Sequence, residues 1–113
     1  PLPGPRIIYQ GKTEPSQWQQ FQGHAFAFHI AVDLTHLKLK KIPFISTSLS
    51  FKTKEGNSQW YAMIPLGLTN VSATGFSFVL TVGNASTIDQ AALRNQGYFL
   101  EYLIFSDEEK DKN

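Results

Sequence analysis

The sequence predicts an all-β fold, in which six strands form a small antiparallel β-sandwich. A chain of 113 residues is long enough for one two-layer core and too short for two. Aromatic residues make up 13% of the chain and include nine Phe, a composition that half-buried pleated sheets favour. In the segments 25–34 and 76–82, large apolar side chains alternate with small or polar ones, which is typical of strands with one buried face.

The sandwich domain is expected to span 16–106, between a Pro-rich N-terminal arm at 1–15 and a charged, disordered tail at 107–113. Four of the six prolines lie in the arm, which favours extended backbone and predicts at most a short strand at 6–9. Most residues of the tail are charged, as is typical of a solvated chain end.

Three strands are expected next in chain order. The first is the alternating segment 25–34, and the second, at 42–52, is entered through Pro43. A third strand is predicted at 59–66. Because the sequence Glu-Gly-Asn at 55–57 is typical of a tight turn, the second and third strands are expected to form a hairpin.

The rest of the domain alternates connections and strands. The polar stretch 69–75 is expected to be a connection into the strand at 76–82. Ser86 and Asp89 have the spacing of a capping box, which predicts one or two helical turns within 86–96. The last strand is predicted at 98–105.

This last strand differs from the others because both of its faces are apolar. The two faces are formed by Tyr98, Leu100, Tyr102 and Ile104 and by Phe99, Glu101, Leu103 and Phe105. Only one face of a strand meets the opposite sheet of a sandwich, and the chain has no long helix to cover the other. We therefore expect the second set to form an oligomer interface, with Glu101 paired to a basic residue of the same or another chain.

Charge and composition disfavour several classes of partner. The formal net charge of +1 supplies no field strong enough to gather nucleic acid. No apolar run approaches the ~20 residues of a membrane-spanning helix, so no membrane insertion is expected. The chain has no Cys, which excludes disulfides and thiolate metal sites, and no cofactor is expected.

The side chains that could carry catalysis or bind a metal do not form a recognisable site. There is no G-x-S-x-G elbow, and the acids outside the tail lie mostly at expected turns, so the chain is not expected to be an enzyme. The spacing of His24, His29 and His36 along a strand predicts no metal site. The lysines within 38–41 suggest either a phosphate contact or protection of a sheet edge, and we favour the second.

Other residues suggest modification or ligand binding. Asn70 and Asn84 each begin an Asn-x-Ser acceptor for N-glycosylation, which matters only if the protein is secreted. Trp60 and Tyr61 follow a polar turn, where an aromatic ring is able to stack on the apolar face of a sugar. The alternative is that Trp60 packs under the hairpin.

Three pieces of the sequence, taken in order, resemble the H-type lectins, the agglutinin and discoidin carboxy-terminal family of six-stranded antiparallel sandwiches. The first runs from Arg6-Ile7 through Gly11-Lys12 to Trp18, and the second is a long strand ending at Leu34 before one that starts at Pro43. The third is the turn Val-Ser-Ala-Thr-Gly-Phe at 71–76. Together the pieces cover most of the chain.

The resemblance implies a trimeric, calcium-independent, sugar-binding protein that is extracellular or at the cell surface, with sites between subunits. The family's sugar contacts are not matched, because Ala25, Gly67 and Asn84 stand where the family has an acid, an arginine and a histidine, and Gly83 stands at its Trp. Asn84 still offers an amide to a sugar hydroxyl.

We therefore expect a homotrimeric carbohydrate-binding module whose site lies at the rim between subunits. The expected ligand-binding residues are Asn84, Trp60, Tyr61, Gly67 and His24. The alternative is a structural, trimerising or protein-interaction domain of a larger surface or fibre protein.

Overall fold

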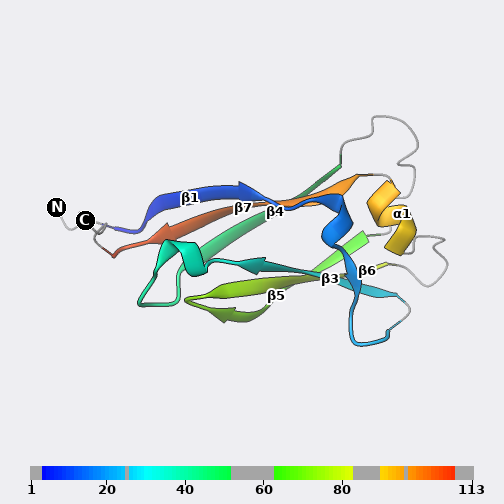
Figure 1. Cartoon of the computed structure of the whole chain (residues 1–113), viewed down its shortest axis with the longest axis horizontal. Helices are drawn as coiled ribbons and strands as arrows, with labels where there is room; N and C mark the ends of the chain where they lie inside the picture. Colours follow the sequence, from blue (N-terminus) through cyan, green and yellow to red (C-terminus); the bar gives the residue numbers. More distant parts are fainter. Residues whose placement is uncertain (1–3, 25, 52–62, 83–89, 96, 109–113) are drawn as a thin grey trace.

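The strands of the protein, seen in a computed structural model, form two antiparallel sheets that face each other, which confirms the expected all-β sandwich (Figure 1). Sheet A has three strands in the order β1-β7-β4, and sheet B has four in the order β2-β3-β6-β5. The structure describes residues 4–24, 26–51, 63–82, 90–95 and 97–108.

In chain order the elements are β1 (Arg6–Lys12), the 3-10 turn η1 (Pro15–Gln17), β2 (Gln19–Gln20), β3 (Ala27–Asp33), the 3-10 turn η2 (Thr35–Leu37), β4 (Phe44–Phe51), β5 (Met63–Ser72), β6 (Gly75–Val82), α1 (Gln90–Asn95) and β7 (Tyr98–Ser106). The strands number seven in the described part of the chain rather than six, because the two-residue β2 pairs with β3.

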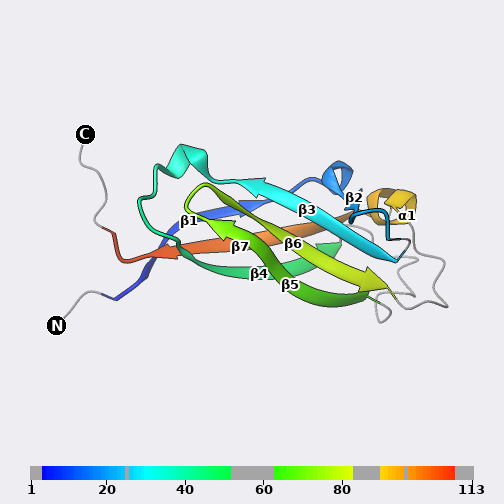
Figure 2. The same ribbon diagram turned by 90° about the horizontal axis from the view of Figure 1, so that it is seen from below.

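The two sheets each have a long central strand. In sheet A, β7 pairs antiparallel with β1 on one side and with all eight residues of β4 on the other. In sheet B, β6 pairs with β3 and with β5, and the β5 ladder has two irregularities. Figure 2 shows the strands of the two layers running the length of the molecule.

The sandwich has two distinct ends. At one end, which we call the helix end, β4 finishes at Phe51, β6 finishes at Val82 and α1 lies beside them (Figure 1). At the other, which we call the terminus end, β1 starts at Arg6 opposite Ser106, the last residue of β7. The nine residues of β7 separate the two ends by roughly 27 Å at the rise of a strand.

The core lies between the sheets and is formed by alternate residues of the long strands. Its largest fully buried side chains are Trp18, Tyr98, Phe28, Ile30, Leu34, Leu80, Leu93, Leu100 and Ile104. The indole N–H of Trp18 donates to the carbonyl of Tyr98 at 2.9 Å, so its polar atom is satisfied inside the core. Burial of each large apolar side chain contributes about 1.5–3 kcal/mol.

The expected hairpin between 42–52 and 59–66 is wrong. The strand β4 lies in sheet A beside β7, whereas β5 lies in sheet B beside β6. The turn that joins β5 to β6 has only two residues, Ala73 and Thr74, and such a short loop closes at the least cost in chain entropy. The expected turn at 55–57 and residues 59–62 lie outside the described part of the chain.

The polar stretch 69–75 is mostly strand rather than connection. Thr69 pairs with Ser77, and Ser72 pairs with Gly75, within the ladder of β5 and β6. Asn70 has a positive φ of 53°, which accommodates the register shift between Thr69 and Ser72. Because β5 is an outer strand of sheet B, its side chains need not be apolar, and composition alone does not distinguish it from a loop.

The remaining elements lie close to their expected positions. The helix expected within 86–96 is present as α1, while Ser86 and Asp89 lie outside the described residues. The strand expected at 6–9 continues to Lys12, so seven residues of the segment expected as an arm form a strand of sheet A, and six of them have a partner on β7.

Candidate functional site

The outward face of sheet A carries a row of apolar side chains that crosses all three strands. Ile7 of β1 and Phe44 of β4 are both register partners of Phe105 of β7, so the three lie side by side at the terminus end. Ile7 is 55% exposed and Phe44 is 64% exposed, while Phe105 between them is half-buried. We call these three residues the apolar row. Ile42, which precedes β4, is also 64% exposed.

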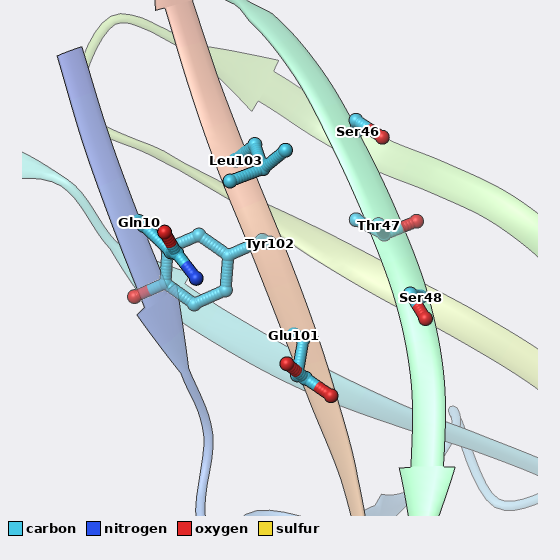
Figure 3. A pocket seen from close by; sticks show the side chains of 7 residues that line it. All are labelled: Gln10, Ser46, Thr47, Ser48, Glu101, Tyr102 and Leu103. Atoms are coloured by element: carbon cyan, nitrogen blue, oxygen red, sulfur yellow. The ribbon is translucent and has the colours of Figure 1, made fainter. Parts of the chain in front are cut away.

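Beside the apolar row, the same face is hollowed by a shallow pocket of about 180 Å³. We call it the serine hollow, and its lining residues are Gln10, Ser46, Thr47, Ser48, Glu101, Tyr102 and Leu103. Figure 3 shows that these side chains come from three neighbouring strands, with Gln10 on β1, Leu103 and Glu101 on β7, and the serines on β4. The hollow therefore combines an apolar centre with hydroxyl, amide and carboxylate groups.

Glu101 is the one acid among the residues that line the serine hollow. Its carboxylate accepts a hydrogen bond from the hydroxyl of Ser50 at 2.8 Å. Lys12 is the register partner of Glu101 on β1, which places a basic residue on the neighbouring strand. The described residues thus bring no second carboxylate into the hollow, and a glycosidase-like acid pair is not assembled there.

The alternation predicted for the last strand is confirmed by the burial of its residues. Tyr98, Leu100, Tyr102 and Ile104 are buried in the core, whereas the expected interface residues Phe99, Glu101, Leu103 and Phe105 face outward. Glu101 is exposed, and the three apolar residues of this set are half-buried by their neighbours on β1 and β4. The four expected residues therefore share one face with the apolar row.

The residues that β1 and β4 contribute to this face were not predicted from the sequence. Ile7, Phe44 and the serines of β4 were not expected to be part of a site, because nothing in the chain alone indicates which strands flank β7. The signal is present only in the register: the alternate residues of β4, Phe44, Ser46 and Ser48, stand opposite the outward residues of β7.

The expected ligand-binding residues are only partly described. Asn84, Trp60 and Tyr61 lie outside the described residues, as do Ala25 and Gly83.

The other two expected ligand residues both belong to sheet B or its loops. Gly67 pairs with Val79 in the middle of β5 and has a φ of +125°, a value that favours glycine. His24 is exposed in the turn before β3, where its backbone N–H donates to the carbonyl of Phe21 at 2.9 Å. That turn lies at the helix end, because Val82 donates to the carbonyl of Phe26. His24 and Gly67 thus lie at different levels of sheet B.

The first glycosylation acceptor lies on an accessible strand. Asn70 is exposed on β5, and the hydroxyl of Ser72 lies 3.0 Å from that of Thr74 and accepts from the backbone N–H of Thr74 at 3.1 Å. The second acceptor, Asn84, lies outside the described residues.

Two of the three histidines, His29 and His36, each contact a different aromatic ring. His36 lies edge-on to the ring of Tyr9 at 5.0 Å, and His29 lies edge-on to that of Phe21 at 5.4 Å. Among the described residues, no three or more His, Cys, Asp or Glu side chains gather as ligands for a metal ion. The described part of the chain contains no helix long and apolar enough to cross a membrane.

Two buried tyrosines of β7, Tyr98 and Tyr102, have raised pKa values. Burial raises the pKa of Tyr98, and burial together with the neighbouring Tyr9 raises the pKa of Tyr102.

Comparison with protein-family models, with curated proteins and with solved structures found no match to this chain in any of the three.

Proposed function

We propose that this protein is a homotrimeric carbohydrate-binding module, which assembles through the outward face of sheet A. The observation that carries the assembly part of the proposal is the apolar row of Ile7, Phe105 and Phe44, which crosses an exposed sheet face without interruption. Contiguous apolar surface of this kind marks an interaction site more often than single exposed residues do.

The apolar surface is large enough to contribute substantially to the free energy of association. Fully burying a Phe or Ile contributes about 1.5–3 kcal/mol, so the row and Ile42 together supply several kcal/mol per subunit. Association costs an estimated 4–15 kcal/mol in lost translational and rotational freedom, so the rest of the face must contribute as well. Leu103 and the hydrogen-bonding groups of the serine hollow extend the same surface.

The number of subunits and the type of ligand come from the resemblance to H-type lectins. The two-sided strand β7 supports assembly independently of that resemblance, and the six longer strands in two antiparallel sheets agree with its expected architecture. The sugar site is proposed at the rim between subunits, with Asn84 and Trp60 as contacts. The extracellular or cell-surface location is part of the same proposal.

A glycan array with the folded, oligomeric protein tests the sugar-binding part of the proposal. We expect at least one specific hit, and we expect Asn84→Ala and Trp60→Ala each to weaken it by tenfold or more. Gln20→Ala, an exposed position on β2, is the matched control and should leave binding unchanged. An array without a specific hit for the folded oligomer would overturn sugar binding while leaving assembly in place.

A second function, a structural or protein-interaction domain, is favoured by the chemistry of the face itself. The apolar row requires only another protein surface, and nothing in the serine hollow is specific to a sugar. An oligomer that binds no glycan supports this alternative.

A further inference from the structure

In the segment between η2 and β4, backbone N–H groups donate hydrogen bonds to the carboxylate of a residue that follows β7. The side chain of Glu108 accepts hydrogen bonds from the N–H of Lys40 at 3.1 and 3.3 Å and from the N–H of Lys41 at 3.1 Å. Both carboxylate oxygens are used, one by Lys40 alone and the other by both residues. Two successive backbone N–H groups aimed at one anion form a nest, a geometry that proteins use to bind anions.

The nest is fixed by contacts on its N-terminal side and does not depend on Glu108 alone. Leu37 and Leu39 are half-buried against the core on either side of Lys38, which has a left-handed φ of 54°. The side chain of Asp33 accepts from the N–H of Thr35 at 2.9 Å at the start of η2. Because alternate leucines hold this segment on the sandwich, the backbone at Lys40 and Lys41 is preorganised.

Glu108 is itself held in position by its backbone. The guanidinium of Arg6 donates to the carbonyl of Glu108 at 2.8 Å, and the N–H of Glu108 donates to the hydroxyl of Ser106 at 3.0 Å. The chain that follows β7 thus places the carboxylate of Glu108 in the nest. Its position identifies the chemical group that the nest accepts.

The charge around the nest favours the same type of group. The side chains of Lys38, Lys40 and Lys41 are all exposed, and the guanidinium of Arg6 contacts the backbone of Glu108. Asp107, the acid next to Glu108 in the sequence, is exposed. Hydrogen bonds from N–H groups to an ionised oxyanion are stronger than those between neutral groups, and neighbouring cations strengthen them further.

We propose that the backbone of Lys40 and Lys41 is a binding site for an oxyanion on a ligand, a carboxylate or sulfate group, and that Glu108 occupies it in the free chain as an internal competitor. The site lies at the terminus end of the sandwich, whereas His24, one of the expected sugar contacts, lies at the helix end. It goes beyond the proposed function and does not require it. The chemistry fits the acidic groups of a polyanionic saccharide.

The competition between Glu108 and a ligand oxyanion for the nest can be measured as a change in the dissociation constant of the ligand. A group tethered by a short segment competes at an effective concentration on the order of millimolar. A ligand oxyanion must displace Glu108 at that concentration before it reaches the nest. We expect the removal of the internal carboxylate to lower the dissociation constant of an external oxyanion at least tenfold, which corresponds to a nest that binds a carboxylate with a dissociation constant of about 0.1 mM or less.

The experiment follows the backbone amide resonances of Lys40 and Lys41 by NMR in wild type and in Glu108→Ala. Three probes are titrated separately: sodium sulfate, a heparin-derived tetrasaccharide, and an oligogalacturonate that carries carboxylates only. In Glu108→Ala we expect at least one probe to shift both amides, with a dissociation constant at least tenfold below that in wild type. The probe that does so identifies the group as sulfate or carboxylate.

The matched control is Asp107→Ala, which changes the net charge by the same amount and leaves the nest occupied. It should bind every probe as wild type does. An equal gain in Asp107→Ala would overturn the proposal, because net charge alone would explain the effect. The absence of any shift at Lys40 and Lys41 in folded Glu108→Ala would also overturn it.

Two further variants keep the test decisive. Glu108→Gln retains the size of the side chain without its charge, so it replaces Glu108→Ala if the latter does not fold, and a smaller gain is expected. In the Glu108→Ala background, Lys40→Ala with Lys41→Ala removes both side-chain charges and should weaken binding at least threefold while the amide shifts persist. Loss of the gain in both Glu108 variants would show that Glu108 only ties down the chain end.

Discussion

The central strands of the two sheets differ in what they present on their outward faces. On β6, the outward residues Ser77 and Val79 are small and are buried within the single chain. On β7, Leu103 and Phe105 are large and remain half-buried, and the apolar row continues onto the flanking strands. Water-exposed apolar surface costs roughly 25 cal/mol per Å² relative to burial, so sheet A has more to gain from a partner than the centre of sheet B.

Sheet B also has exposed apolar residues, but their arrangement differs. Ile64 is 52% exposed and Leu66 is 61% exposed, and both lie on the outer strand β5 around Pro65. The register shift between Pro65 and Gly67 leaves Leu66 without a partner across the ladder. These residues therefore do not form a row across strands, which makes them a matched control for the apolar row.

The largest effect on stability is expected from the inward face of β7. Ile104→Ala removes a fully buried side chain and should lower the free energy of unfolding by about 2–5 kcal/mol. Leu103→Ala, one residue earlier on the outward face, should cost about 1 kcal/mol or less in the single chain. Urea denaturation of both variants at one low protein concentration compares them, and the reverse order would contradict the assignment of faces.

The packing of β1 on β7 gives the next largest effect. A Cβ at Gly11 would lie 2.5 Å from the ring of Tyr102, so Gly11→Ala should destabilise the fold by about 1–3 kcal/mol. Gly4→Ala is the control, since a Cβ there has nothing within 4 Å. Thermal denaturation measures both variants. An unchanged melting temperature in Gly11→Ala would mean that β1 does not pack on β7 as described.

A small effect, in the stabilising direction, is expected from Tyr98→Phe. The hydroxyl of Tyr98 is buried and has no hydrogen-bond partner within the described part of the chain. Its removal relieves an unsatisfied polar group, so we expect a gain of about 1 kcal/mol or no change. Urea denaturation gives the difference. A loss greater than ~1 kcal/mol would show that the hydroxyl has a partner.

The smallest effect is expected at Asp33, the last residue of β3. The backbone N–H and the hydroxyl of Thr35 donate to Asp33 and lower the pKa of its carboxyl. Because the folded pKa lies below the unfolded value, the stabilisation is present above the unfolded pKa and is lost as pH falls through the folded one. In Asp33→Asn, the free energy of unfolding should therefore fall slightly less between pH 6 and pH 2 than it does in wild type. A steeper loss of stability with falling pH in the variant would contradict the lowered pKa of Asp33.

The strands could be predicted from the sequence wherever burial of one face makes large apolar residues alternate with small or polar ones. The strands at 25–34 and 76–82 and the two-faced strand at 98–105 were found in this way, because each has large side chains on alternate residues. The pairing of β4 with β7 within sheet A was not predicted, because it depends on contacts between segments that are distant in the chain.

The candidate site was predictable in part for the same reason. The outward residues of β7 follow from its own sequence, whereas the apolar row also needs the register with β1 and β4. The contact between Glu108 and the nest joins residues 67 and 68 positions apart, and a charged chain end gives no indication of it in the sequence.

The most direct test of assembly through sheet A is the solution mass of three proteins by light scattering. Wild type is expected at three times the 12.7 kDa of one chain, Phe44→Ser with Phe105→Ser at the mass of one chain, and Ile64→Ser with Leu66→Ser at the wild-type mass. Circular dichroism shows whether each variant is folded. A folded wild-type protein that stays at the mass of a single chain at high micromolar concentration would contradict the central claim.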